Sequence, residues 1–101
     1  MGHMKVHEFV KYIPEGRENG ISRAELARLI GINDRHMRKL VEMARCDGVP
    51  IINLQNGEGY YISHDPLEMR AQFNINQARI RVLAAQQTHL ARLLNKAGTK
   101  V

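Results

Sequence analysis

Residues 22–47 carry the clearest structural pattern of this chain and read SRAELARLIGINDRHMRKLVEMARCD. Ser22 stands three residues before Glu25, which is the spacing of a capping box at the start of a helix. Gly31 falls where a helix needs a left-handed residue at its end. Asn33 is then placed to cap a second helix. The pattern therefore predicts two helices that are joined by a turn of three residues.

Apolar side chains recur on one face of each predicted helix at spacings of three and four, which is typical of a buried helical stripe. Their members are Leu26, Leu29 and Ile30 in the first helix, and Met37, Leu40, Val41 and Ala44 in the second. A turn this short makes the two helices cross steeply. Ala27 supplies the small side chain that such a crossing needs.

The flanking sequence predicts a short helix before this pair and a hairpin after it. Apolar residues at positions 6, 9, 10 and 13 mark one helical face, and Pro14 should end that helix near residue 12 or 13. Two β-prone stretches, 50–54 and 60–63, flank an Asn-Gly pair and predict a hairpin. Of the adjacent Tyr60 and Tyr61, one should pack on the core and one should be partly exposed.

A last helix is predicted after Asp65, because Pro66 and Glu68 complete its start signal. Residues 67–97 contain neither Gly nor Pro, so this helix can extend over about 30 residues. One line of side chains along this helix, which we call the seam, repeats at alternating spacings of four and three residues, as in the heptads of a two-helix interface. The seam positions are Met69, Phe73, Asn76, Ile80, Leu83, Gln87, Leu90 and Leu94. We expect this helix to dimerise, and the alternative is a helix that folds back on its own domain.

Size and composition limit the class of protein. The 101 residues, of which 44% are apolar, suit one small domain with an appendage. We expect no membrane helix and no disulfide framework, because apolar runs are short and Cys46 is the single cysteine. Metal-ligand spacing, cofactor loops and small-molecule sites are not evident in the sequence. A cytoplasmic binding protein is therefore expected rather than an enzyme, with Met1-Gly2-His3 as a cloning remnant.

The formal net charge of +5 is concentrated near the end of the chain. Residues 66–101 carry six Lys or Arg side chains and one acidic side chain, Glu68. A basic chain favours a polyanionic partner. The alternative interpretation is a solvated helix face, because the basic residues are spaced singly.

The order of helix, helix, tight turn, helix and hairpin resembles the winged helix-turn-helix of bacterial and phage DNA-binding proteins. The resemblance covers residues 5–63 and rests on Ile30-Gly31-Ile32 at the turn, Gly48-Val49 after the helix and Gly57-Glu58-Gly59-Tyr60 at the return strand. The chain resembles the N-terminal module of the biotin operon repressor, and more loosely small phage and prophage regulators. After the hairpin we expect a single long helix instead of that repressor's effector domain, so the resemblance does not imply biotin chemistry.

The resemblance implies a mainly α fold with a small β-hairpin, built as a DNA-binding domain over residues 4–64 and a dimerisation helix over residues 65–97. In such folds the N-terminal half of the second motif helix enters the major groove. The candidate contacts are Arg35 and Arg38 for bases, Lys39 for phosphate, Ser22 and Arg23 at a helix N-terminus, Asn33 and His36 beside them, and Gln55 and Asn56 in the wing.

The predicted function is sequence-specific binding of double-stranded DNA as a homodimer, in transcriptional regulation or in phage or prophage replication or recombination. The predicted location is the cytoplasm of a bacterial or phage-infected cell, on the nucleoid when bound. The competing class is a protein-interaction adaptor that uses the same scaffold and last helix, and RNA binding is a third option. Glu58 at the wing tip argues against a wing that contacts phosphate.

Overall fold

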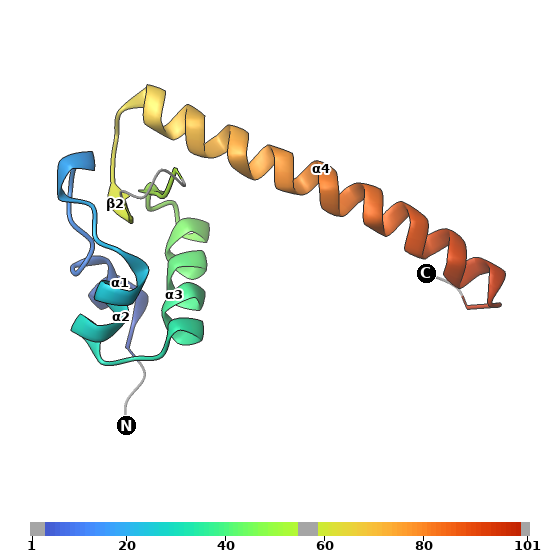
Figure 1. The fold of residues 1–101 in the computed structure, drawn as a ribbon, viewed down its shortest axis with the longest axis horizontal. Coiled ribbons are helices and arrows are strands. Elements are labelled where there is room, and N and C mark those ends of the chain that lie inside the picture. Colours follow the sequence, from blue (N-terminus) through green and yellow to red (C-terminus); the bar gives the residue numbers. More distant parts are fainter. Residues whose placement is uncertain (1–3, 55–58, 100–101) are drawn as a thin grey trace.

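The computed structural model describes residues 4–54 and 59–99 and is mainly helical, with a two-stranded antiparallel sheet and a long C-terminal helix (Figure 1). The elements in chain order are α1 (Val6–Val10), the 3-10 helix η1 (Arg17–Asn19), α2 (Arg23–Ile30), α3 (Asp34–Cys46), β1 (Ile51–Ile52), β2 (Tyr61–Ile62) and α4 (Pro66–Lys96). Elements α1 to β2 form one packed unit, from which α4 projects (Figure 1).

The predicted turn between α2 and α3 is confirmed. Gly31 has φ 82° and ψ 32°, a left-handed conformation that glycine adopts without steric cost. The N–H groups of Gly31 and Ile32 both donate to the carbonyl of Ala27, at 2.9 and 3.1 Å. The side chain of Asn33 then accepts from the N–H of His36 at 2.7 Å and caps α3. The direction of α3 is therefore set within three residues.

Helix α2 differs from its prediction in two details. Ser22 accepts from the N–H of Glu25 as expected, but the Glu25 carboxylate accepts from Arg28 at 2.8 Å, so only half of the capping box forms. Leu29 is 60% exposed and does not belong to the buried stripe. A helix of eight residues presents one narrow face to the core, and Leu26 occupies it here.

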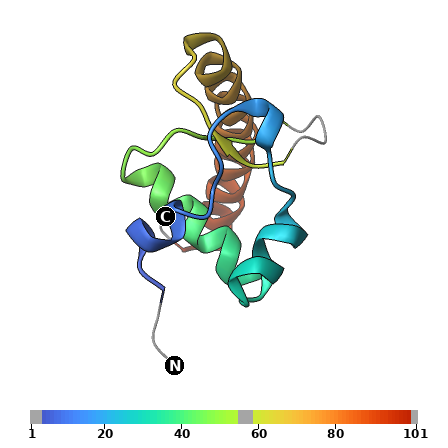
Figure 2. The same cartoon turned by 90° about the vertical axis from the view of Figure 1, so that its left-hand side faces the viewer.

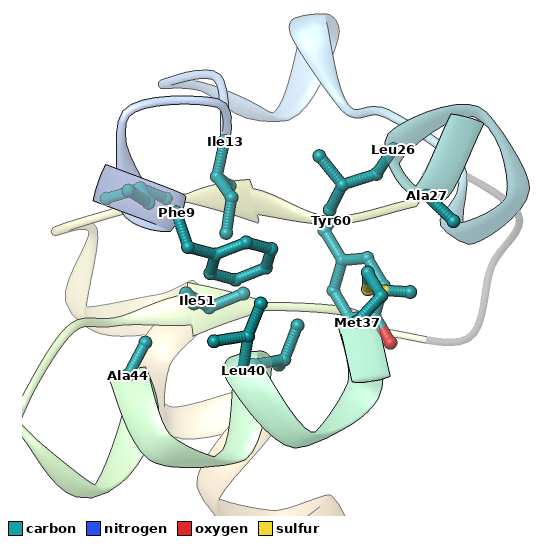
Figure 3. Close-up of a cluster of buried hydrophobic side chains, with 11 residues drawn as sticks. Phe9, Ile13, Leu26, Ala27, Met37, Leu40, Ala44, Ile51 and Tyr60 are labelled. Atoms are coloured by element: carbon teal, nitrogen blue, oxygen red, sulfur yellow. The ribbon is translucent and has the colours of Figure 1, made fainter. Parts of the chain in front are cut away.

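The core lies between α1, α2, α3 and the sheet, with the Phe9 ring near its centre (Figure 3). It contains the predicted stripe of α3, and its buried members are Phe9, Ile13, Leu26, Ala27, Met37, Leu40, Val41, Ala44, Ile51, Tyr60 and Ile62. Burial of a Leu or Phe side chain contributes about 1.5–3 kcal/mol. This cluster therefore holds α3 against the rest of the unit by one face only.

Helix α1 ends at Val10, three residues earlier than the limit set by Pro14. The chain continues as tight turns, in which the N–H of Tyr12 donates to Phe9 and that of Ile13 donates to Val10. Ile13 still reaches the core by this route.

The sheet is shorter than predicted and has neighbours that the sequence did not indicate. Ile51 pairs with Ile62 and Ile52 pairs with Tyr61, and residues 55–58 between the strands lie outside the described part of the chain. On the other side of β2, single bridges join Glu15 to Ile62 and Ile21 to Tyr60.

Both tyrosines of the return strand are buried, Tyr60 to 6% and Tyr61 to 1% exposure, which contradicts the expectation that one is partly exposed. The reason is that the first turns of α4 also pack on the sheet. The Tyr61 hydroxyl donates to the Glu68 carboxylate at 3.2 Å, and the Ser63 hydroxyl donates to the same carboxylate. Glu68 thus anchors α4 to β2 instead of completing a capping box with Asp65, whose side chain alone caps the helix.

A second polar contact continues this anchor. The backbone N–H of Asn53 donates to the Gln72 side chain at 2.7 Å, and Gln72 in turn donates to Asn76 at 3.2 Å. Beyond these turns α4 runs away from the unit, as the two perpendicular views show (Figures 1 and 2). The predicted single helix is confirmed, and the alternative in which it folds back on its own domain is not observed. No helix in the described residues is long and apolar enough to cross a membrane.

Two glycines with positive φ provide a matched test of this geometry. An added Cβ would meet open space at Gly31, but at Gly59 (φ 79°) it would collide with the backbone of Ile21. We expect Gly31→Ala to lower the free energy of unfolding by about 1 kcal/mol, through backbone strain alone. Gly59→Ala should cost about 2–4 kcal/mol, because it also breaks the bridge between Ile21 and Tyr60. Urea denaturation measures both, and equal losses would contradict the close approach at Gly59.

Candidate nucleic-acid interface

The outer face of α3 is basic. Arg35, Arg38 and Lys39 are exposed, whereas Met37 between them and Leu40 directly after them are buried in the core. The predicted orientation of the three cations is therefore found, with His36 half-buried beside them. Because the core packs against the apolar face of α3, its basic face is open to a ligand along the N-terminal half of the helix.

Asp34 forms ion pairs with one of these cations, Arg38, and with Arg23 of α2. Its carboxylate lies 2.8 Å from Arg23 Nε and 3.4 Å from Arg38 Nε, and so joins the start of α2 to α3. About half of each side chain is exposed. Exposed ion pairs of this kind contribute about 0.2–1 kcal/mol, so a phosphate or a base can replace the carboxylate at small cost. Arg35 and Lys39 make no ion pair with any described residue.

Ser22 and Asn33 are used as helix caps. The Ser22 hydroxyl accepts from Glu25, and the Asn33 carboxamide oxygen accepts from His36. Ser22 also lines a hollow of about 360 Å³ between the start of α2 and the sheet, together with Arg23 and Tyr60. The two remaining predicted contacts, Gln55 and Asn56, lie outside the described residues.

A larger pocket, of about 430 Å³, lies where α3, the sheet and α4 meet, and four arginines line it. Two of them, Arg23 and Arg38, are predicted site residues, and the other two are Arg45 of α3 and Arg79 of α4. Glu42 is the acidic residue in the lining. The structure therefore joins the basic face of α3 to a second group of cations.

Arg45 is the most constrained of these cations. Its Nε donates to the carbonyl of Ile51 at 3.0 Å, while its Nη2 is buried and has no acceptor among the described residues. A buried donor without a partner costs about 1–3 kcal/mol. Burial lowers the pKa of Arg45, Arg79 lowers it further by repulsion, and Tyr60 and Glu42 oppose these effects. The guanidinium is thus held in place without a counter-ion in contact.

The sequence did not indicate Arg45 as a site residue, and it indicated Arg79 only as one of the spaced basic residues of the last helix, for which phosphate contact and a solvated face were both open. A signal for Arg45 is present, since Arg38, Glu42 and Arg45 are spaced four and three apart and so share a stripe of α3. For Arg79 the local sequence carries no such signal. Its place in the pocket depends on the direction in which α4 leaves the sheet, which the contacts of Glu68 and Gln72 determine.

The predicted dimerisation positions of α4 are all exposed, and they are Phe73, Asn76, Ile80, Leu83, Gln87, Leu90 and Leu94. The five apolar members are between 41% and 59% exposed. Within the described part of α4, Gln72 is the only buried residue. The Arg70 guanidinium lies 5.2 Å from the centre of the Phe73 ring and covers part of it. An apolar stripe, which Asn76 and Gln87 interrupt, is therefore left without a partner in the single chain.

No protein-family model, curated protein or solved structure matches this chain. Among residues 4–54 and 59–99, no group of three or more His, Cys, Asp or Glu side chains is arranged to hold a metal ion.

The repulsion between Arg45 and Arg79 has a measurable consequence. In phosphate-free buffer of low ionic strength, Arg79→Gln should raise the free energy of unfolding by a few tenths of a kcal/mol, because it removes a like charge from the pocket. Arg81→Gln is the control, since it removes the same charge from the same helix but does not line the pocket. Urea denaturation in low and high salt checks this, and a gain shared by both variants would show that overall charge is the cause.

Proposed function

We propose that residues 4–64 form a winged helix-turn-helix that binds double-stranded DNA through α3, and that the chain acts as a homodimer through α4. One observation carries the proposal. Arg35, Arg38 and Lys39 are exposed on a helix whose opposite face is buried and whose N-terminus is fixed by the turn at Gly31 and the cap at Asn33.

Such a helix suits the major groove, which admits an α-helix by its N-terminal half. Arg35 is free of ion pairs in the described structure and is the foremost candidate for a bidentate contact with guanine. Arg38 contacts a base by exchanging Asp34 for it, and Arg23 then exchanges the same carboxylate for a phosphate. Lys39 provides a point charge for the backbone. Asp34 thus holds both arginines in place until DNA replaces it.

Dimerisation through α4 is supported by its exposed seam. Monomeric proteins rarely leave long apolar stripes uncovered. The seam residues repeat at four and three, which is the spacing of a two-helix interface. A dimer presents two α3 helices to one duplex, and the second contact then gains effective concentration from the first. This arrangement suits sites with two half-sites about one helical turn apart.

The proposed role is transcriptional regulation or phage or prophage replication or recombination in a bacterial or infected cell. The alternative is a protein-interaction adaptor, which the stripe on α4 also favours, because the stripe is exposed on a helix that projects from the packed unit (Figure 1). A gel shift at several salt concentrations separates the two. A DNA-binding protein prefers a selected site over random duplex at every salt concentration, whereas an adaptor binds all duplexes weakly and uniformly.

Three substitutions on α3 test the DNA contact. Arg35→Ala and Arg38→Ala should each weaken binding to a selected site by about 1–3 kcal/mol and relax its sequence preference, because each removes a base contact. Lys39→Ala should weaken binding to all sequences alike. Arg28→Ala is the matched control, since it removes an exposed arginine from α2 that is paired with Glu25. Parental affinity in both arginine variants would rule out α3 as the base-reading helix.

A substitution in the middle of the seam tests the dimer. Leu83→Asp should raise the dimer dissociation constant about 100-fold or more, because both copies lose a buried Leu and gain a charge. Ala85→Asp introduces the same charge on the opposite face of α4 and should leave the dimer intact. Sedimentation equilibrium of the full chain measures this. A parent that is monomeric at high micromolar concentration would exclude dimerisation through α4.

A further inference from the structure

The pocket between α3, the sheet and α4 brings together charges from distant parts of the chain. Arg45 and Arg79 are 34 positions apart in the sequence, yet both line it. Neither forms an ion pair within the part of the chain that the structure describes, and the two positive charges repel each other. Arg23 and Arg38 line the same pocket and share the single carboxylate of Asp34. The cluster is thus short of negative charge.

One donor without an acceptor belongs to a residue that lines this pocket. Arg45 Nη2 is buried with no partner in the described residues. Tyr60 also lines the pocket, and its hydroxyl lies beside the first turn of α3 in Figure 3. By contrast, both ends of the Gln72 amide are occupied by Asn53 and Asn76. A ligand that suits this region is therefore an anion that accepts several hydrogen bonds.

We propose that this pocket binds a phosphate group, which Arg45 of α3 and Arg79 of α4 hold together. A phosphate carries up to two charges and several acceptor oxygens, so it can accept from two guanidiniums at once. A carboxylate has fewer oxygens and one charge. The volume of about 430 Å³ leaves room for the group that a phosphate is attached to.

Two sources of phosphate share this chemistry. Arg38 and Glu42 line both this pocket and the hollow beside Arg35 and Lys39, so the pocket continues the basic face of α3. A backbone phosphate of DNA bound on α3 can enter it, and this source depends on the proposed function. A free phosphorylated molecule is the other source. With either one, the ligand joins α3 to α4 and fixes the direction of the seam relative to the basic face.

The first arm of the test uses inorganic phosphate and the full chain. Phosphate replaces chloride at constant ionic strength, and backbone NMR shifts near Arg45 and Arg79 give the dissociation constant. Arg79→Gln should weaken binding about tenfold or more, as the loss of a charge-assisted hydrogen bond implies. Arg81→Gln should bind like the parent. Glu42→Gln should bind more tightly, because it removes the carboxylate from the lining, and a gain cannot result from misfolding.

The second arm uses a duplex of random sequence and the same variants. If a DNA phosphate fills the pocket, Arg79→Gln flattens the slope of log K against log salt by about 0.9, the value of one phosphate contact, and Arg81→Gln does not. An unchanged slope, with phosphate binding that depends on Arg79, identifies a free phosphorylated ligand. If the parent does not bind DNA, the proposed function fails and the phosphate arm alone decides.

Three results would overturn the phosphate pocket. One is a parent protein that does not bind phosphate and whose binding to DNA does not depend on Arg79. Another is equal weakening by Arg79→Gln and Arg81→Gln, which would reflect overall charge. The third is a Glu42→Gln variant that binds no more tightly than the parent.

Discussion

The left-handed turn at Gly31 is the constraint on which the rest of this structure depends. It ends α2, and within three residues the cap at Asn33 starts α3 in a new direction. Because a turn of three residues fixes the orientation of α3 relative to α2, the apolar stripe of α3 faces Phe9 and the sheet, and its basic stripe faces outward. A longer or looser turn would let α3 rotate, and the same arginines would then have no fixed position relative to the sheet.

A second constraint is the pair of polar contacts that fix α4. Glu68 accepts from Tyr61 and Ser63, and Gln72 accepts from the backbone of Asn53. These contacts are directional, so they set the path of the helix as well as its position. As a result, Arg79 lies at the pocket of α3, while the seam beyond it is exposed to a partner. The anion pocket and the exposed stripe have the same cause.

Charge in the basic region is arranged in two ways. Around Asp34, two arginines share a carboxylate that a ligand can displace at small cost. Around Arg45, the cation is partly buried and its Nη2 has no acceptor among the described residues, so a ligand adds a partner instead of replacing one. The exposed face suits exchangeable contacts along a duplex, whereas the pocket suits a single anion. The proposed function uses the first arrangement, and the phosphate pocket uses the second.

The sequence by itself determined the features that depend on near neighbours in the chain. Helix starts at Ser22, Asn33 and Asp65, the turn at Gly31 and the stripe of α3 follow from contacts within four residues, and those predictions are confirmed. The outward face of α3 follows from that stripe, so the exposure of Arg35 was predictable too.

Only the tertiary structure decided what depends on distant segments. The burial of Tyr61, the bridges of β2 to Glu15 and Ile21, and the meeting of Arg45 with Arg79 each join residues far apart in the chain. Leu29 illustrates the same limit, because its position in α2 matches the spacing of the apolar stripe and yet its side chain is 60% exposed. Periodicity specifies which side chains share a face of one element. Which element covers that face depends on packing and on directional polar contacts, and those exist only once the chain has folded.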